Sequence, residues 1–403
     1  MGVRMKYKFL ICSLLIAVCC FPINAQDFGI VLDQNGDFTD SKAEYTGTLI
    51  PRLNILLGDN ADIFMSAGIN FKIDANNPEN YSIIPELLRT EAAFRFGMGE
   101  LRVGRILYQD PLGLIAAGLF DGAAYSQSTK YGNFNIGGFY TGLLYKERAS
   151  IEMTFKEKQL SELKVDYNNF ADTYFAPRRT LVSLGWNNPS LLGRLDIKTA
   201  LIGQFDLTDE NLHTQYAAAK IAIPLSNIIF DIGGSLELLQ QEGNFNIALM
   251  GELGIAWLPS LSLPSKFSFT GQFTSGVFED SNITAFIPLS TVPQGNMLNA
   301  NISGLSILSL DYLVRLKHTL SANVNVSYFI RSDLGTYKQY PVIGIDSDGY
   351  FLGAEIYGQL FWNISTGVRM NLGAGVFLPS LGDAAPNADM LWRAELNLII
   401  SIY

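Results

Sequence analysis

Residues 319–331 show the clearest alternation of apolar and polar side chains in the chain. One side carries Leu320, Ala322, Val324, Val326, Tyr328 and Ile330, and the other is polar except for Phe329. A repeat of two residues is typical of a β-strand rather than a helix. The stretch is also longer than the roughly 5–6 residues of an average strand in a globular protein, whereas a membrane-crossing strand needs about 9–11. The pattern therefore predicts a strand long enough to cross a membrane.

Similar alternation recurs along the chain and predicts about 18 strands, with 16 as the alternative count. We expect them near residues 28–33, 44–57, 62–73, 84–97, 100–108, 119–128, 132–145, 178–187, 192–207, 212–224, 227–240, 244–258, 263–278, 300–316, 319–331, 350–363, 366–377 and 390–403. Each strand has one apolar face. The other face carries small or polar residues and isolated charges, as the wall of a water-filled lumen does.

Short and long connections alternate between these strands. The longer ones are expected at 34–43, 74–83, 109–118, 146–177, 279–299, 332–349 and 378–389. Short turns at one rim and long loops at the other are typical of outer-membrane barrels, and an even number of strands places both termini at the short-turn rim. The fold class expected is all-β, a transmembrane antiparallel β-barrel. A soluble β-sandwich would usually carry more Lys and Glu on its polar faces.

Composition agrees with a barrel whose wall faces lipid. The chain is 48% hydrophobic and 16% charged, whereas an average soluble protein is about 25% charged. After residue 30 the longest apolar run is 112–120, which is too short for a membrane-spanning helix. A hydrophobic chain without such a helix is either a large soluble β-domain or a barrel, and the strand lengths favour the barrel.

The N-terminus predicts export. Three basic residues (Arg4, Lys6 and Lys8) precede an apolar stretch at 9–21, and Ala25 supplies a small residue for cleavage. We expect a signal peptide at 1–25 and a single barrel domain at 26–403, located in the outer membrane of a diderm, Gram-negative-type bacterium. The alternative is an uncleaved membrane anchor, but the apolar stretch is short for a helix that spans a membrane.

The three cysteines all lie inside the expected signal peptide, at Cys12, Cys19 and Cys20. The mature chain would then have no disulfide, thiolate metal site or cysteine nucleophile. Lipidation at Cys19 or Cys20 is the other reading, but neither is preceded by a small residue, since Val18 comes before Cys19.

Net charge limits the partners. The whole chain has a formal charge of −10, and removing residues 1–25 takes away three basic and no acidic residues, which leaves −13. This balance argues against nucleic acid as a partner. The expected partners are outer-membrane lipid, the barrel assembly machinery and small polar solutes. A monomer and a homo-oligomer both remain open, and no cofactor is expected.

The last part of the chain, 350–403, resembles outer-membrane porins of the alginate-export type. The resemblance rests on Gly353-Ala354-Glu355, Trp362 and the run Gly373-Ala374-Gly375-Val376-Phe377-Leu378-Pro379, with a weaker echo at Gly104-Arg105 and Asp121-Gly122. It implies a barrel that passes polar or anionic solutes. The final strand departs from the usual assembly signal, because Tyr403 falls on the polar face and Ile402 on the lipid face.

Charged residues on the polar faces are the candidate pore-lining residues. A charge on the lipid face would cost about 2–4 kcal/mol at mid-membrane, so their phase is a constraint. They set the field of the pore, or pair across strands and brace the wall, and both roles stay open. The candidates are Arg52, Arg89, Glu91, Arg95, Arg102, Arg194, Asp196, Asp231, Glu237, Glu252, Asp311, Arg315, Glu355, Arg369, Arg393 and Glu395.

Catalysis and metal binding have little support, and we expect neither. The mature chain has two histidines, His213 and His318, of which His213 lies near Asp209 and Glu210. A barrel hydrolase could use such a pair, but no spacing identifies a serine nucleophile. The stretch 346–349 (Asp-Ser-Asp-Gly) could begin a calcium loop, yet the remaining ligands of that motif are missing.

The charged segment 146–177 has two readings, a constriction folded into the pore or a loop exposed beyond the membrane, and the second is favoured. The function expected is an outer-membrane porin for passive diffusion of small polar solutes. A surface adhesin or structural barrel acting through its loops is the alternative, and a barrel hydrolase around His213 is the third class. Acidic long loops predict a weak preference for cations, which arginines in the lumen and the alginate-type resemblance oppose.

Overall fold

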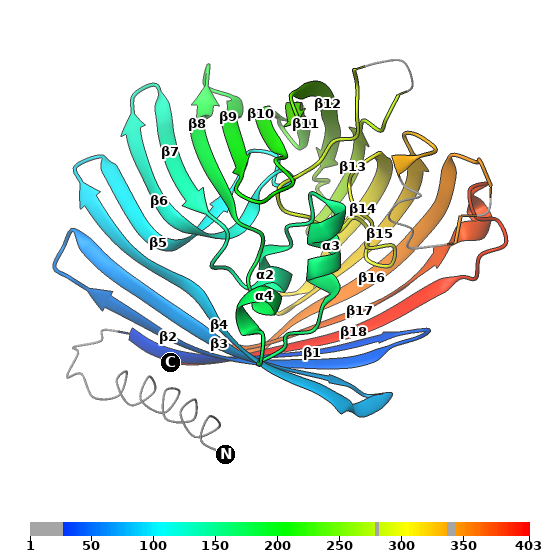
Figure 1. The fold of residues 1–403 in the computed structure, drawn as a ribbon, viewed down its shortest axis with the longest axis horizontal. Coiled ribbons are helices and arrows are strands. Elements are labelled where there is room, and N and C mark those ends of the chain that lie inside the picture. Colours follow the sequence, from blue (N-terminus) through cyan, green and yellow to red (C-terminus); the bar gives the residue numbers. More distant parts are fainter. Residues whose placement is uncertain (1–26, 279–281, 337–343, 346) are drawn as a thin grey trace.

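The computed structural model describes residues 27–278, 282–336, 344–345 and 347–403. They form one closed antiparallel barrel of 18 strands in which each strand pairs with its sequence neighbours and β1 pairs with β18 (Figure 1). The strand count and the fold class are therefore confirmed. The expected signal peptide at 1–25 lies outside the described residues.

The strands have the following bounds: β1 Asp27–Thr39, β2 Ala43–Leu56, β3 Ala61–Asp74, β4 Asn77–Phe96, β5 Gly99–Gln109, β6 Ala117–Thr129, β7 Gly132–Tyr140, β8 Arg179–Leu191, β9 Leu195–Asp206, β10 His213–Leu225, β11 Ile228–Gln241, β12 Asn244–Trp257, β13 Ser265–Thr274, β14 Leu305–Lys317, β15 Leu320–Arg331, β16 Phe351–Ser365, β17 Val368–Leu378 and β18 Leu391–Ile402.

Two of the expected long loops are strand instead. β1 continues to Thr39 and β4 begins at Asn77, so the connections shrink to 40–42 and 75–76. Both extensions are rich in polar residues on both faces. Alternation is lost there, but the backbone ladder continues because strand pairing needs only N–H and C=O groups.

The outer face of the barrel is an apolar surface. On β15, Val324 and Val326 point outward with exposed fractions of 45% and 39%, in the phase that the sequence predicts. The same holds around the wall, for example at Leu201, Leu253 and Leu310. None of the helices among the described residues is long and apolar enough to cross a membrane. A continuous apolar belt on a closed barrel is a surface suited to lipid.

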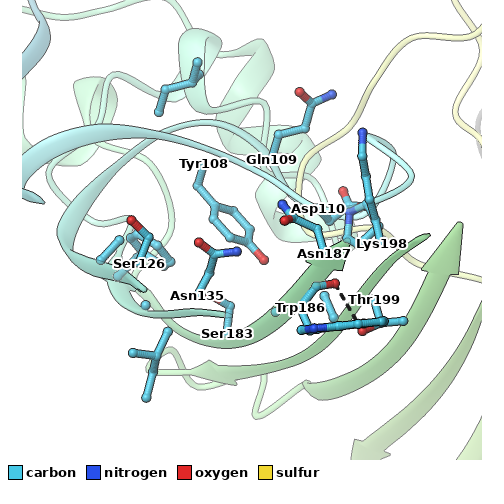
Figure 2. Close-up of a pocket in the computed structure, with 18 of the residues that line it drawn as sticks. Tyr108, Gln109, Asp110, Ser126, Asn135, Ser183, Trp186, Asn187, Lys198 and Thr199 are labelled. Atoms are coloured by element: carbon cyan, nitrogen blue, oxygen red, sulfur yellow. Dashed lines mark hydrogen bonds between the residues drawn. The ribbon is translucent and has the colours of Figure 1, made fainter. Parts of the chain in front are cut away.

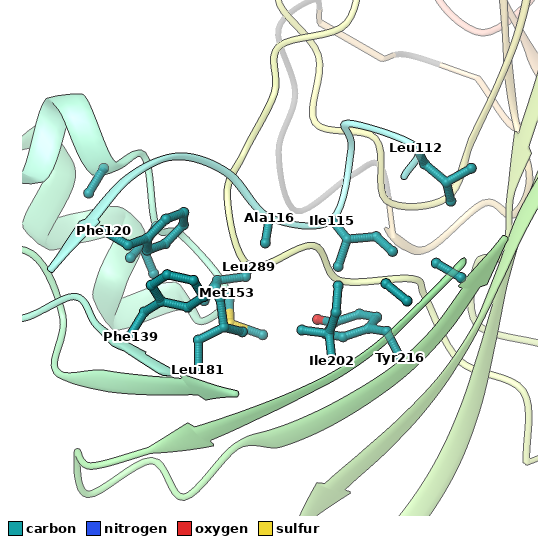
Figure 3. Packing of buried hydrophobic residues seen from close by; sticks show 14 of the residues in the cluster. Leu112, Ile115, Ala116, Phe120, Phe139, Met153, Leu181, Ile202, Tyr216 and Leu289 are labelled. Atoms are coloured by element: carbon teal, nitrogen blue, oxygen red, sulfur yellow. The ribbon is translucent and has the colours of Figure 1, made fainter. Parts of the chain in front are cut away.

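Three connections at the long-loop rim fold into the barrel instead of leaving it. Segment 110–116, segment 141–178 and segment 282–304 pack with inward residues of β5–β12 in one buried apolar cluster. Figure 3 shows Ile115, Met153 and Leu289 of these segments beside Phe139 and Ile202 of the strands, among other members. These three segments cover the apolar side chains on the inner wall of the barrel.

Segment 141–178 contains the helices α2 (Lys146–Ala149), α3 (Phe155–Glu162) and α4 (Phe170–Tyr174). They lie inside the ring of strands in Figure 1. The expectation of a loop exposed beyond the membrane is therefore wrong, and the inward reading holds. The charged residues of this segment suggested a loop exposed to water. The same segment also has an apolar side, formed by Leu144, Ala149, Ile151, Met153 and Ala176, which is buried inside the barrel.

A second apolar cluster fills the inner side of β14–β18. Met297, Leu298 and Ala300 of segment 282–304 meet Phe329 and other inward residues there, next to Ala384 and Ala385 after the short 3-10 helix η2 (Pro379–Leu381). Phe329 is the residue that broke the polar side of its strand in the sequence. It is fully buried because the folded-in segment covers it.

One face assignment in β16 is wrong. Alternation in the sequence puts Leu352 on the apolar side with Ile356 and Leu360, the side expected to face lipid. In the structure Leu352 is fully buried inside, while Phe351 is 43% exposed. The pairing of β15 with β16 shifts register beside Gly353, which has φ +132°. A bulge of this kind places one extra residue in a strand and reverses the phase beyond it.

Candidate functional site

The long-loop half of the lumen is filled by segments that buried carboxylates hold in place. Asp110, 4% exposed, accepts the backbone N–H groups of Leu112, Gly113, Ile115 and Ala116 at 2.8–3.0 Å. These four bonds close segment 110–116 around one side chain. A carboxylate that accepts this many backbone donors keeps the loop in a single shape.

Glu355 on β16 does the same for segment 282–304. It is fully buried and accepts the backbone N–H groups of Asn296 at 2.7 Å, Met297 at 2.9 Å and Leu298 at 3.4 Å. Glu237 on β11, also fully buried, accepts the N–H of Ile287 at 2.9 Å. Both point into the barrel as the sequence predicts. They are occupied by loop backbone, however, so they are not free charges on a pore wall.

Arg179, at the start of β8, holds segment 141–178 from below. Its guanidinium is fully buried and contacts Glu157 at 2.7 Å and Asp206 at 3.4 Å. Glu157 also accepts the N–H groups of Met153 and Thr154, and it closes a capping box on α3. Burial raises the pKa of Glu157 above its ordinary value, against the opposing effect of Arg179. One guanidinium thus serves two buried carboxylates.

The short-turn half of the lumen is organised differently, by pairs of charged side chains within one strand or on neighbouring strands. Arg89 pairs with Glu91, and Arg95 with Asp62 on the neighbouring strand. Arg102 pairs with Glu100 and lies 4.0 Å from Glu91. The arginine side chains are 40–46% exposed, so these pairs border open space. Both roles considered from the sequence, bracing and field-setting, fit this cluster.

Arg393 on β18 lies in the long-loop half, where the first and last strands pair. It binds Asp37 of β1 through two bonds of 2.7 and 3.2 Å, pairs with Glu395, and donates to the carbonyl of Asn296 at 2.7 Å. Tyr357 donates its hydroxyl to Glu395. The arginine therefore closes the β1–β18 seam and holds segment 282–304 at once.

The other predicted pore residues have mixed positions. Arg52 stacks its guanidinium 4.5 Å from the ring centre of Tyr403. Asp311 accepts from Asn325 at 2.9 Å. Arg194 was expected on the lumen face of a strand, but it lies exposed in the turn 192–194. The strand positions of five further candidates agree with the inward phase expected from the sequence: Asp196, Asp231, Glu252, Arg315 and Arg369.

A cavity of about 660 Å³ is lined by residues of β5–β10 and by the start of segment 110–116 (Figure 2). Its lining includes Arg102, Lys198 and Lys220 together with polar groups such as Tyr108 and Asn135. Lys198 and Lys220 are directly opposite each other on β9 and β10, and Lys220 pairs with Glu252 at 2.8 Å. The sequence reasoning missed both lysines. Lys198 has the same even-numbered phase as Asp196 on β9, so the alternation that identified Asp196 as a lumen-facing residue would also have identified Lys198.

A smaller polar cavity of about 280 Å³ lies on the inner side of β13–β16. Its lining includes Gln272, Asp311, Asn323, Asn325 and Gln359. The two cavities show that the loops do not fill the lumen completely.

His213 does not form the acid pair considered from the sequence. Its Nδ1 accepts the backbone N–H of Asp206 at 3.0 Å, and its ring lies near Phe205. Glu210 pairs instead with Lys156, and no bond joins His213 to Asp209 among the described residues. In the candidate calcium stretch, Asp346 lies outside the described residues.

No family model and no curated relative matches the chain. Solved structures of similar fold do exist. The outer membrane protein OpdK of Pseudomonas aeruginosa matches with a TM-score of 0.62 and 14% identity, covering 94% of this chain and 99% of that one. OccK5 (OpdH) of the same organism gives 0.60 and 14%, over 94% and 100%. OprD gives 0.59 and 12%, over 93% and 94%.

At these identities the likeness is one of fold. It is shared with the barrels of OpdK and OprD, and it does not single out the alginate-export type.

Proposed function

We propose that this chain is an outer-membrane channel for passive diffusion of small polar solutes. The observation that carries the proposal is the charged, water-accessible cavity of about 660 Å³ inside a closed barrel with an apolar outer face. An apolar exterior suits lipid, and a polar interior suits water and dissolved solutes. Similar barrels include OpdK, one of whose structures contains vanillate, a small carboxylate.

The cavity has a basic character that favours solutes with a negative group. Lys198 and Lys220 face each other, and Arg102 lies on the same lining. Acidic residues at the long-loop rim, such as Asp40, Asp74 and Asp209, oppose this by raising the local concentration of cations. We keep the prediction of a weak cation preference at the mouth, with local anion binding deeper in the lumen.

Conductance in planar bilayers tests the channel. Purified barrel should give stable unit conductances, and the reversal potential in a KCl gradient gives the selectivity. Lys198→Gln should shift that potential towards cations, whereas Lys130→Gln, in the turn between β6 and β7, should change it less. Folded protein with no conductance would overturn the channel and favour the alternative, a surface adhesin or structural barrel.

Export to the outer membrane belongs to the same proposal. The mature protein should begin at Gln26 and carry no lipid, which mass spectrometry of the membrane-extracted protein measures. An acylated cysteine at position 19 or 20 would contradict this. The barrel assembly machinery and a homo-oligomer are proposed partners, and no catalytic role is assigned to His213.

A further inference from the structure

The wall of the barrel is incomplete between β4 and β5. β4 has 20 residues, but it pairs with β5 only from Thr90↔Arg105 to Phe96↔Gly99. Above that level β4 keeps β3 as its partner, and β5 keeps β6. In Figure 1 the tip of the β3–β4 hairpin extends to the lower right, away from β5 on the left. The barrel therefore stays closed in its short-turn half and divides in its long-loop half.

Both strands are irregular at the level where they separate. Gly104 has φ +125°, a region that glycine enters without strain, and a Cβ there would lie 2.2 Å from the carbonyl oxygen of Thr90. The β3–β4 register shifts between Met65 and Ala67 at the same height. Pro85 then occupies the unpaired edge, where its lack of an N–H costs no ladder bond. The division is built into the backbone.

Side chains take the place of the missing strand on the β4 edge. Every second carbonyl along it accepts a side-chain donor: Ile83 from the Tyr167 hydroxyl, Pro85 from the Tyr174 hydroxyl at 2.8 Å, and Leu87 from the Arg105 guanidinium. Arg105 is 6% exposed and also donates to the carbonyl of Leu143 at 2.9 Å. The two tyrosines and Leu143 belong to segment 141–178, which therefore closes the gap.

Contacts on the inner side hold the segment there. Arg148 forms two bonds with Glu86, at 2.9 and 3.1 Å, and Ile84 packs with Tyr145 and Tyr174. Apolar residues continue on the outer wall on both sides of the gap: Ile83 and Leu87 on β4, and Val103 and Leu107 on β5, are 43–63% exposed. The gap thus connects the lumen with the lipid-facing belt, and only side-chain contacts separate them.

We propose that this gap is a lateral window between the lumen and the outer leaflet, closed by segment 141–178, and that it passes small amphiphiles with one apolar and one charged end. Aromatic rings and the Arg148–Glu86 pair offer both kinds of contact along the window. Opening it breaks no strand pairing, so the barrel stays closed below. This route adds to the axial one and rests on the proposed membrane location.

A reversible cross-link tests the window. Glu86→Cys/Arg148→Cys, joined by a short bis-methanethiosulfonate linker, holds the segment shut, and a reductant releases it. The expected mature chain has no cysteine of its own. In single-channel recordings, decyltrimethylammonium dissolved in the bilayer should block the axial current of the reduced channel, and the linked channel should resist. Tetramethylammonium, which has no chain, should affect both states equally.

Equal block in the linked and reduced states would overturn the window, because the amphiphile would then enter through the mouth. Absence of block in both states, with normal conductance, would overturn it too. Absence of current would refute the proposed channel instead, and the second measurement then decides the window.

The second measurement is spin-label accessibility in nanodiscs, with the label at Ile84→Cys. Adding Tyr167→Phe/Tyr174→Phe should raise collisions with oxygen, which concentrates in lipid, more than collisions with a water-soluble nickel complex. Tyr328→Phe is the matched control, since Tyr328 also donates to a carbonyl, that of Leu381 at 2.8 Å. An unchanged oxygen signal, or an equal rise with the control, would overturn the proposal.

Discussion

The two halves of the lumen use the same residue types for different work. In the long-loop half, Glu355 and Glu237 are fully buried and bind backbone N–H groups of folded-in segments. In the short-turn half, charged side chains pair with one another, as Arg95 does with Asp62, and the arginines stay partly exposed. A carboxylate that accepts hydrogen bonds from unpaired backbone N–H groups holds a loop in place. A carboxylate that pairs with an arginine beside water contributes to the electric field of the lumen.

The largest difference between the halves is expected at Arg179. Arg179→Ala leaves Glu157 and Asp206 buried without their shared cation. Breaking a buried pair in this way costs about 3–5 kcal/mol. Arg95→Ala removes an exposed partner of Asp62 and should cost under about 1 kcal/mol. Urea unfolding in lipid vesicles measures both, and equal losses would contradict the comparison.

The wall that both halves share is tested by its phase. Val324→Arg places a charge on the outer face of β15 and should cost about 2–4 kcal/mol, whereas Asn325→Arg points inward and should cost much less. The yield of folded, heat-modifiable protein in membranes measures this. Equal yields of the two variants would show that the faces are assigned wrongly.

A smaller effect is expected when a loop anchor is weakened without loss of volume. Glu355→Gln keeps one acceptor oxygen but loses the charge that three backbone donors share, which should cost about 1–3 kcal/mol. The freed segment should make single-channel current noisier. Glu100→Gln is the matched change among the paired charges of the short-turn half. A noisier current in Glu100→Gln than in Glu355→Gln would reverse the assigned roles.

The smallest effect is a pH dependence at Glu157, which lies on α3 outside the membrane-spanning strands. Burial raises its pKa in the folded protein above the ordinary value of 4.5. The folded state therefore holds this proton more tightly than the unfolded state. The resulting stabilisation is complete below the ordinary pKa and is lost as pH rises through the raised one.

Thermal unfolding of the wild type and Glu157→Gln, compared from pH 7 down to 4.5, isolates this group. The wild type should gain stability relative to the variant as pH falls. A constant difference, or a gain in the other direction, would show that Arg179 controls the ionisation.

Much of the fold follows from the sequence, because strand alternation is a local property. The count of 18 strands and the outward phase of Val324 and Val326 depend only on which neighbouring residues are apolar. Exceptions to the alternation also carried information. Phe329 on a polar face marked a place that a loop covers, and Pro85 within β4 marked an unpaired edge.

Tertiary structure alone decided what the inward residues do. Glu355 and Glu395 have the same phase and chemistry in the sequence. Glu355 meets the backbone of Asn296, 59 positions away, whereas Glu395 meets Arg393. The inward course of segment 141–178 and the gap beside β4 likewise depend on contacts between distant segments, such as Arg148 with Glu86. Alternation along a strand determines whether a side chain points inward or outward. Packing between segments distant in the sequence determines which groups that side chain contacts.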